Sequence, residues 1–137
     1  MAYKTISLIV TDADRDAPAL SAASGIAQRE GAHLDVHCIG IDMSHFESLP
    51  VGATAVMLES TLAEARDRAN ALAEWVKGAL STELVGVSVQ PAVAPQLGLD
   101  ASVSRLARYS DLVVAAKPYG AGRDSGQVTV VEAALFA

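Results

Sequence analysis

The chain has 137 residues, enough for one domain around a single core, and 51% of them are hydrophobic while only 4% are aromatic. The core must therefore be built from Ala, Val, Leu and Ile. The net charge of −6 at pH 7 disfavours nonspecific binding to nucleic acids or to acidic membranes. One cysteine excludes an internal disulfide, and no apolar run approaches the ~20 residues of a membrane span, so we expect a cytoplasmic protein with no membrane partner.

Strands and helices alternate along the chain. Short apolar, β-branched runs predict four strands, over 5–11, 33–39, 85–93 and 112–116. Apolar residues at helical spacing predict a helix after each strand: from Asp16 to Gly31, over 54–80, from a cap at Asp100 or Ser102 through Ala107, and over 129–136. This alternation implies right-handed crossovers, so we expect an α/β fold, a doubly wound parallel sheet with helices on both faces.

Local signals set the expected boundaries. Asp16 is a suitable cap for a helix with Pro18 in its first turn, and Gly31 suits the left-handed conformation of a helix end. Residues 40–53 contain two glycines and a proline, which predicts a loop. Pro91 lacks an N–H group, so its end of the third strand cannot pair fully on both sides.

Four segments, taken in order, resemble the universal stress protein family. They are the strand that enters Asp12, the passage from Gly31 to Ile39, the run Ala107–Val114 and the helix that starts Thr129-Val-Val-Glu. The resemblance covers nearly the whole chain and implies an adenine nucleotide α-hydrolase-like fold. It also implies a noncatalytic stress-response domain that dimerises and binds an adenine nucleotide such as ATP weakly.

Family members add a final strand after the fourth helix, and the sequence ends at Ala137 without one. We therefore expect residues 1–137 to form a single domain that is truncated before its last strand, as in the first half of a tandem protein. Because family members dimerise through that strand, we expect self-association through another surface. The candidates are the edge of the fourth strand, the terminal helix or an exchanged segment.

A glycine-rich, partly basic loop lies between the fourth strand and the last helix, a position where α/β proteins hold phosphates. The family's nucleotide binders carry Gly-x2-Gly-x9-Gly-Ser/Thr there. Gly120, Gly122 and Gly126 do not have that spacing, and Val128 stands where the last glycine should precede Thr129. We therefore expect weak or no ATP binding.

The resemblance matches Asp12 and the backbone at Ile39 to the adenosine side of the family's site. The candidate cofactor-binding residues are Asp12, Ile39, Lys117, Gly120, Gly122, Arg123, Ser125, Gly126 and Thr129. The charged and hydroxyl side chains of the loop could gather a small anion beside the helix dipole. The alternative is a solvated loop whose glycines only turn the chain. Asp12, the end of the second strand and the loop all follow predicted strands, which favours one shared cleft.

No catalytic residue and no metal ligand is assigned. His33 and His37 share one face of a strand, but Cys38 points to the other face, so we expect incidental surface or boundary histidines and an inert core thiol. The acidic group of Asp12, Asp14 and Asp16 could hold a divalent cation, but capping and solvation explain it more simply. The competing hypothesis is a nucleotide-hydrolysing or nucleotide-activating enzyme of the related α-hydrolase superfamily that uses the same cleft.

Overall fold

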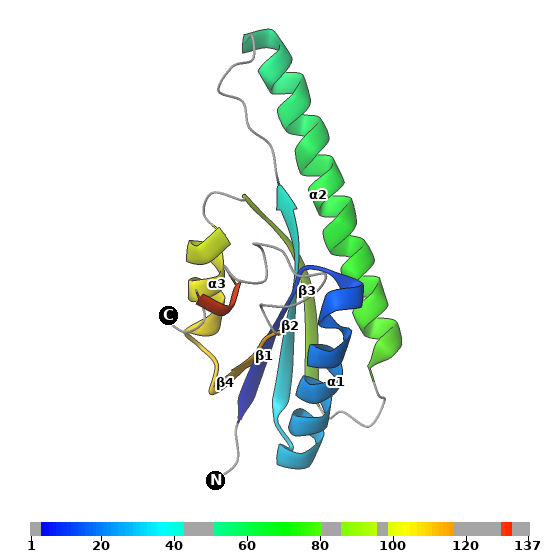
Figure 1. The fold of residues 1–137 in the computed structure, drawn as a ribbon, viewed down its shortest axis with the longest axis vertical. Coiled ribbons are helices and arrows are strands. Elements are labelled where there is room, and N and C mark those ends of the chain that lie inside the picture. The colour runs from blue at the N-terminus through cyan, green and yellow to red at the C-terminus, as the bar shows by residue number, and fades with distance from the viewer. Residues whose placement is uncertain (1–3, 43–50, 81–85, 96–98, 117–129, 133–137) are drawn as a thin grey trace.

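The computed structural model describes residues 4–42, 51–80, 86–95, 99–116 and 130–132. Its elements are β1 (Thr5–Val10), α1 (Ala13–Glu30), β2 (His33–Asp42), α2 (Val51–Ala79), β3 (Gly86–Pro95), α3 (Leu99–Ala107) and β4 (Leu112–Val114) (Figure 1). Residues 130–132 are also helical. The strand order is β3-β2-β1-β4, and every neighbouring pair is parallel. The predicted alternation and the parallel sheet are confirmed.

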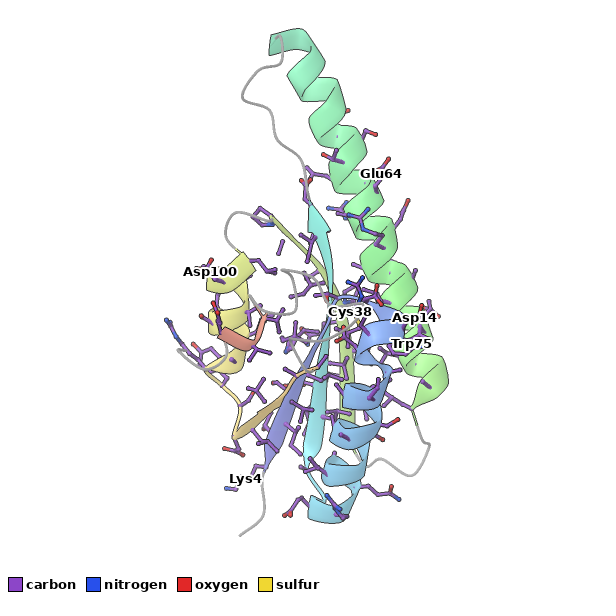
Figure 2. The ribbon with its side chains drawn as sticks, in the orientation of Figure 1. Lys4, Asp14, Cys38, Glu64, Trp75 and Asp100 are labelled. Atoms are coloured by element: carbon purple, nitrogen blue, oxygen red, sulfur yellow. The ribbon has the colours of Figure 1, made fainter. Side chains whose placement is uncertain are left out.

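The helices cover both faces of this sheet, which confirms the doubly wound arrangement. One core cluster joins the face of β1 that carries Leu8 to α1 and α2, and a second joins the face that carries Ile9 to α3 and Val130. Side chains such as Cys38 fill the first of these layers (Figure 2). The buried hydrophobic residues of the described core are aliphatic apart from Cys38, as the composition predicts. Among the described residues, no helix has the length and apolarity that a bilayer crossing requires.

Helix α1 begins earlier than predicted, and its cap is a different aspartate. The N-cap is Asp12, whose side chain accepts a hydrogen bond from the backbone of Arg15, so the expected cap at Asp16 is wrong. Pro18 consequently lies inside the helix, not in its first turn. Gly31 does end the helix as predicted, with a φ of 62° and its N–H bonded to the carbonyl of Ala27.

Strand β2 extends through Asp42, so the predicted loop over 40–53 is wrong at both ends: residues 40–42 are strand, and α2 already begins at Val51. Gly40 pairs with Val93 within the sheet, and α2 crosses close above it. A Cβ atom at Gly40 would stand 1.8 Å from the backbone oxygen of Ala65. Only glycine permits this approach between strand and helix.

Strand β3 ends at Pro95, beyond the predicted residue 93, and the boundaries of α3 and β4 also differ from the prediction. Helix α3 begins at Leu99, so neither Asp100 nor Ser102 is its N-cap; Asp100 lies in the first turn, where a carboxylate complements the helix dipole. Strand β4 ends at Val114. Pro91 lies in β3, which is an edge strand of the described sheet, as its missing donor requires.

The amino ends of β1 and β4 are joined by one carboxylate. Asp111 Oδ2 accepts hydrogen bonds from the backbone N–H groups of Lys4 at 2.8 Å and Thr5 at 3.0 Å, and the Asp111 N–H donates to the Thr5 carbonyl at 2.9 Å. The hydrogen bonds from the N–H groups of Thr5 and Lys4 lower the pKa of the Asp111 carboxyl. The bonds hold in register a strand that has only three pairs with β1.

Candidate functional site

Helix α1, which follows β1, and the helical residues 130–132, which follow β4 in the sequence, pack on opposite faces of the sheet. After β1 the chain enters α1, which packs in the first core cluster. After β4 it continues through Ala116 and returns at Val130, which packs in the second cluster beside α3. Adjacent parallel strands whose connections diverge in this way leave a crevice at their carboxyl ends, where open α/β sheets bind ligands.

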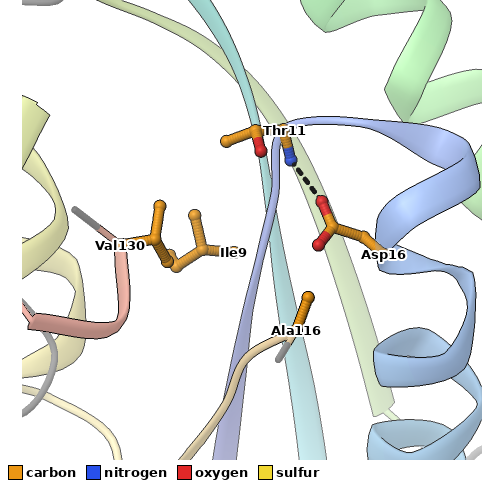
Figure 3. A pocket seen from close by; sticks show the side chains of 5 residues that line it. All are labelled: Ile9, Thr11, Asp16, Ala116 and Val130. Atoms are coloured by element: carbon orange, nitrogen blue, oxygen red, sulfur yellow. Dashed lines mark hydrogen bonds between the residues drawn. The ribbon is translucent and has the colours of Figure 1, made fainter. Parts of the chain in front are cut away.

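A pocket occupies this point. Its lining residues are Ile9, Thr11, Asp16, Ala116 and Val130, and its cavity volume of about 10 Å³ has room for a single water molecule (Figure 3). Four of the five are buried: Ile9 and Asp16 are 2% and 3% exposed, and Val130 and Ala116 are 5% and 8% exposed. The pocket therefore has apolar walls and a single buried carboxylate.

The turn between β1 and α1 is held by that carboxylate. Asp16 Oδ2 accepts a hydrogen bond from the backbone N–H of Thr11 at 2.8 Å (Figure 3). It accepts a second from the backbone N–H of Asp12 at 3.0 Å. The Asp16 N–H in turn donates to the Asp12 carbonyl at 3.0 Å. Asp12 completes the turn by accepting from the Arg15 N–H at 3.0 Å through Oδ1. The acidic loop after the first strand is thus a capped helix entry, the simpler of its two predicted roles.

Ile39 does not follow a strand end, contrary to the expectation from sequence. It lies inside β2, is 1% exposed and packs in the second core cluster with Ala94 and Val103. The last pair between β1 and β2 joins Val10 to Cys38, so the backbone of Ile39 lies one residue beyond the end of β1. Asp12 and the Ile39 backbone therefore both lie at the carboxyl end of β1, although neither lines the pocket.

The remaining candidates for cofactor binding lie outside the described residues: Lys117, Gly120, Gly122, Arg123, Ser125, Gly126 and Thr129. The pocket nevertheless includes the neighbours of this segment in the chain. Ala116 immediately precedes Lys117, and Val130 immediately follows Thr129. The crevice that the strand order predicts and the glycine-rich segment are therefore connected directly through the chain.

Sequence reasoning missed most of the pocket's lining. Ile9, Ala116 and Val130 carry no polar group, and periodicity marks them only as core positions. From the sequence, Thr11 was predicted to be the last residue of the first strand and Asp16 to be a helix cap. The sequence did contain one usable signal. Ala116 and Val130 flank a glycine-rich segment that follows a buried strand, and such flanking residues line the crevice when the strand lies at the switch point.

His33, His37 and Cys38 are not among the residues that line this pocket, and His45 lies outside the described residues. His33 Nε2 is 2.9 Å from Asp35 Oδ1 and 3.0 Å from Ser88 Oγ. Because one ring nitrogen meets both groups, this is not a serine–histidine–aspartate relay, which uses the two nitrogens separately. His37 is buried at 8% exposure, not a surface residue, and burial lowers its pKa. Within the described part of the chain no cluster of three potential metal ligands occurs.

Cys38 confirms the predicted inert thiol. Its side chain is fully buried among the first core cluster, on the opposite face of β2 from His37. Burial raises the pKa of the thiol to about 11. The thiolate, which is the reactive form, is therefore scarce at neutral pH.

No protein-family model matches this chain, and no curated protein matches it. Solved structures do. Universal stress protein UspA from Lactobacillus plantarum superposes with a TM-score of 0.64 at 20% identity, over 98% of this chain and 94% of that chain. A universal stress protein crystallised in complex with cAMP superposes with a TM-score of 0.52 at 21% identity, over 99% of this chain and 90% of that one. The likeness that the sequence indicated is confirmed at the level of architecture: this chain has the fold of the universal stress proteins.

Proposed function

We propose that this chain is a noncatalytic, universal stress protein-type domain that binds an adenine nucleotide weakly in the crevice between β1 and β4. The observation that carries the proposal is the crevice at the carboxyl ends of β1 and β4, where Thr11 and Asp16 meet the two residues that flank the glycine-rich segment. The cAMP complex of a protein with the same fold supports an adenine ligand. Asp12, at the end of β1, is the residue we expect to contact its adenosine part.

The composition of the pocket supports a binding role over a catalytic one. Its walls are apolar at Ile9, Ala116 and Val130. The Asp16 carboxylate already accepts two backbone hydrogen bonds, so it is engaged in holding the turn between β1 and α1. The competing hypothesis remains an enzyme of the α-hydrolase superfamily that cleaves or activates a nucleotide. Release of phosphate or AMP from ATP that persists through purification to homogeneity, and that is lost in Asp12→Ala or Thr129→Ala, would favour the enzyme.

The binding test has two parts. Mass spectrometry of small molecules released by denaturing freshly purified protein should detect an adenine compound. Calorimetry with Mg-ATP should give a Kd weaker than about 10 μM, which is about −7 kcal/mol. A tighter Kd would contradict the altered phosphate loop, whereas no binding of adenosine, AMP, cAMP or ATP up to about 1 mM would refute the proposal itself.

The role of Asp12 needs a variant that separates binding from folding, because its side chain also caps α1. Asp12→Ala removes both functions and should cost about 1 kcal/mol of stability. Asp12→Ser retains a capping oxygen but withdraws the carboxylate, so it should keep the stability and weaken binding of the adenine compound. Equal binding by Asp12→Ser and the wild type would remove Asp12 from the site.

We further propose that the protein acts as a homodimer in the cytoplasm. Strand β4 pairs only with β1 in the described sheet, so its other edge is a candidate for pairing with a second copy. The opposite edge is less suited, because β3 carries Pro91 and Pro95. Light scattering at tens of micromolar should give a dimer, and a clean monomer would refute this part of the proposal.

A further inference from the structure

A second concave site lies between helix α2 and strand β3. It is a groove lined by three residues of α2 and three of β3, namely Arg66, Ala69, Asn70, Pro91, Ala92 and Val93. Its cavity volume is about 390 Å³, which is within the range of sites that hold small molecules. Strand β2 lies between β3 and β1, so the groove and the crevice between β1 and β4 are built on different strands.

The packing of α2 on the sheet explains why this groove is open. The helix comes closest to the sheet over Gly40 of β2, where Ala65 and Ala69 are buried against the strand. In β3, the neighbouring strand, Val93 pairs with Gly40 but is only half-buried, and Pro91 is exposed. Because β3 is an edge strand of the described sheet, its outer side has no strand to cover it. The flank of α2 and the surface of β3 therefore form the two walls of the groove.

The groove contains one cation that has no partner. Arg66 is exposed, and within the described part of the chain it makes no hydrogen bond or ion pair. Arg68 differs, because it donates a hydrogen bond to the Ile41 carbonyl at 2.6 Å. On a helix, an arginine commonly pairs with a carboxylate three or four residues away. The residues at these distances from Arg66 are all uncharged: Leu62, Ala63, Ala69 and Asn70.

The chemistry of the lining suits a small organic acid. A guanidinium group offers a planar fork of N–H donors that matches a carboxylate. Asn70 follows Arg66 by four residues on the same side of α2, and its carboxamide can add a further donor. Pro91 and Val93 supply apolar surface for the rest of the ligand. A single cation, in a chain of net charge −6, matches one negative charge better than several.

We propose that the groove between α2 and β3 binds a small organic monocarboxylate. The carboxylate pairs with Arg66 and Asn70, and the apolar body of the ligand lies against Pro91 and Val93. This site is independent of the proposed adenine site, so either can fail without the other.

Nuclear magnetic resonance titrations of the intact ¹⁵N-labelled chain test the proposal with three probes: benzoate, its neutral analogue benzamide, and inorganic phosphate. Benzoate should bind saturably with a Kd of about 1 mM or tighter and should shift the backbone amide signals of Asn70 and Val93. Benzamide and phosphate should each bind at least about fivefold more weakly, because one lacks the charge and the other the apolar body. Absence of saturation by benzoate up to about 20 mM would refute the site. Phosphate or benzamide binding as tightly as benzoate would overturn the assignment to a monocarboxylate.

Two matched variants assign the charge. Arg66→Gln should weaken benzoate binding at least about fivefold and leave benzamide binding unchanged. Arg108→Gln removes an equal charge from an exposed residue that directly follows α3, on the other face of the sheet, and should change both affinities less than about twofold. Urea unfolding checks that both variants keep the stability of the wild type. Equal benzoate binding by Arg66→Gln and the wild type would refute the role of Arg66; should Arg66→Gln not fold, the order of the three probes on the wild type still decides the proposal.

Discussion

Gly40 offers the sharpest test of how the helical layer sits on the sheet. Its Cβ would lie 1.8 Å from the Ala65 carbonyl oxygen, 2.7 Å from the Ala65 carbonyl carbon and 3.2 Å from the Ala69 nitrogen. Ordinary contact begins at 3.4 Å, so Gly40→Ala lacks about 1.6 Å of space against helix backbone. Among the described glycines only Gly31 has a positive φ, so alanine at 40 is opposed by space and not by backbone conformation.

The cost follows from what must move. Helix α2 has to withdraw from β2, and the buried residues Ala65 and Ala69 lose contact with the strand. A gap of 0.5–1 Å already forfeits a quarter to a half of the dispersion attraction of facing atoms. Overpacking typically costs 1–3 kcal/mol. Because backbone atoms cannot rotate away, we expect about 3 kcal/mol or more, a large part of the 5–15 kcal/mol typical of a domain.

Urea unfolding monitored by far-ultraviolet circular dichroism measures this cost. Gly40→Ala should lower the midpoint by about 1–3 M. The matched controls are Gly25→Ala in α1 and Gly78→Ala in α2, where an added Cβ meets nothing within 4 Å. These should be neutral or raise stability by up to about 1 kcal/mol through helix propensity. A Gly40→Ala protein within about 1 kcal/mol of wild type, with an unchanged m-value, would refute the close approach of α2 to β2.

Three further predictions concern titratable groups. Backbone hydrogen bonds from Thr5 and Lys4 lower the pKa of the Asp111 carboxyl. Its contribution to stability is therefore present above the pKa of the unfolded chain and is lost as the pH falls through the folded pKa. Asp111→Asn should be less stable than the wild type at pH 7 and should lose less stability on acidification, measured as the urea midpoint against pH. Burial lowers the pKa of His37, so the unfolded chain takes up the proton first and the stability of the fold decreases below about pH 6.5. His37→Gln should make the urea midpoint depend less on pH between pH 8 and 5. An unchanged dependence would contradict the burial of His37. Cys38, with its pKa raised to about 11, should resist iodoacetamide at pH 8 in the native protein and react in urea, as mass spectrometry will show; rapid native alkylation would contradict its packing.

The sequence by itself determined the order of elements and the parallel sheet. Short, β-branched apolar runs predicted the strands and stripes of helical period predicted the helices, in the order β1, α1, β2, α2, β3, α3 and β4. It also determined features that depend on a few neighbouring residues. Gly31 ends α1 since a left-handed residue is needed there, and Cys38 and His37 face opposite sides of β2 because strand side chains alternate.

Ambiguity began where several residues suited one local role. Aspartate is a good N-cap residue, so the sequence favours Asp12 and Asp16 equally. Only the path of the chain out of β1 decided that Asp12 caps α1 and that the Asp16 side chain accepts hydrogen bonds from the backbone of the turn. The predicted caps of α3, Asp100 and Ser102, are also wrong, because the helix already begins at Leu99 and both residues lie inside it.

The tertiary structure alone decided the contacts between distant segments. Gly40 reads as a loop residue until the backbone of Ala65, 25 positions away, is seen to lie against it. Asp111 directly precedes the predicted fourth strand, and only the structure shows that its carboxylate binds the backbone of Lys4 and Thr5. The pocket has the same origin: Ile9, Asp16, Ala116 and Val130 come from four parts of the chain and meet only because the strand order places β4 beside β1. Periodicity reports which face a residue turns to, whereas the partner it meets there depends on how strands and helices pair across the whole chain.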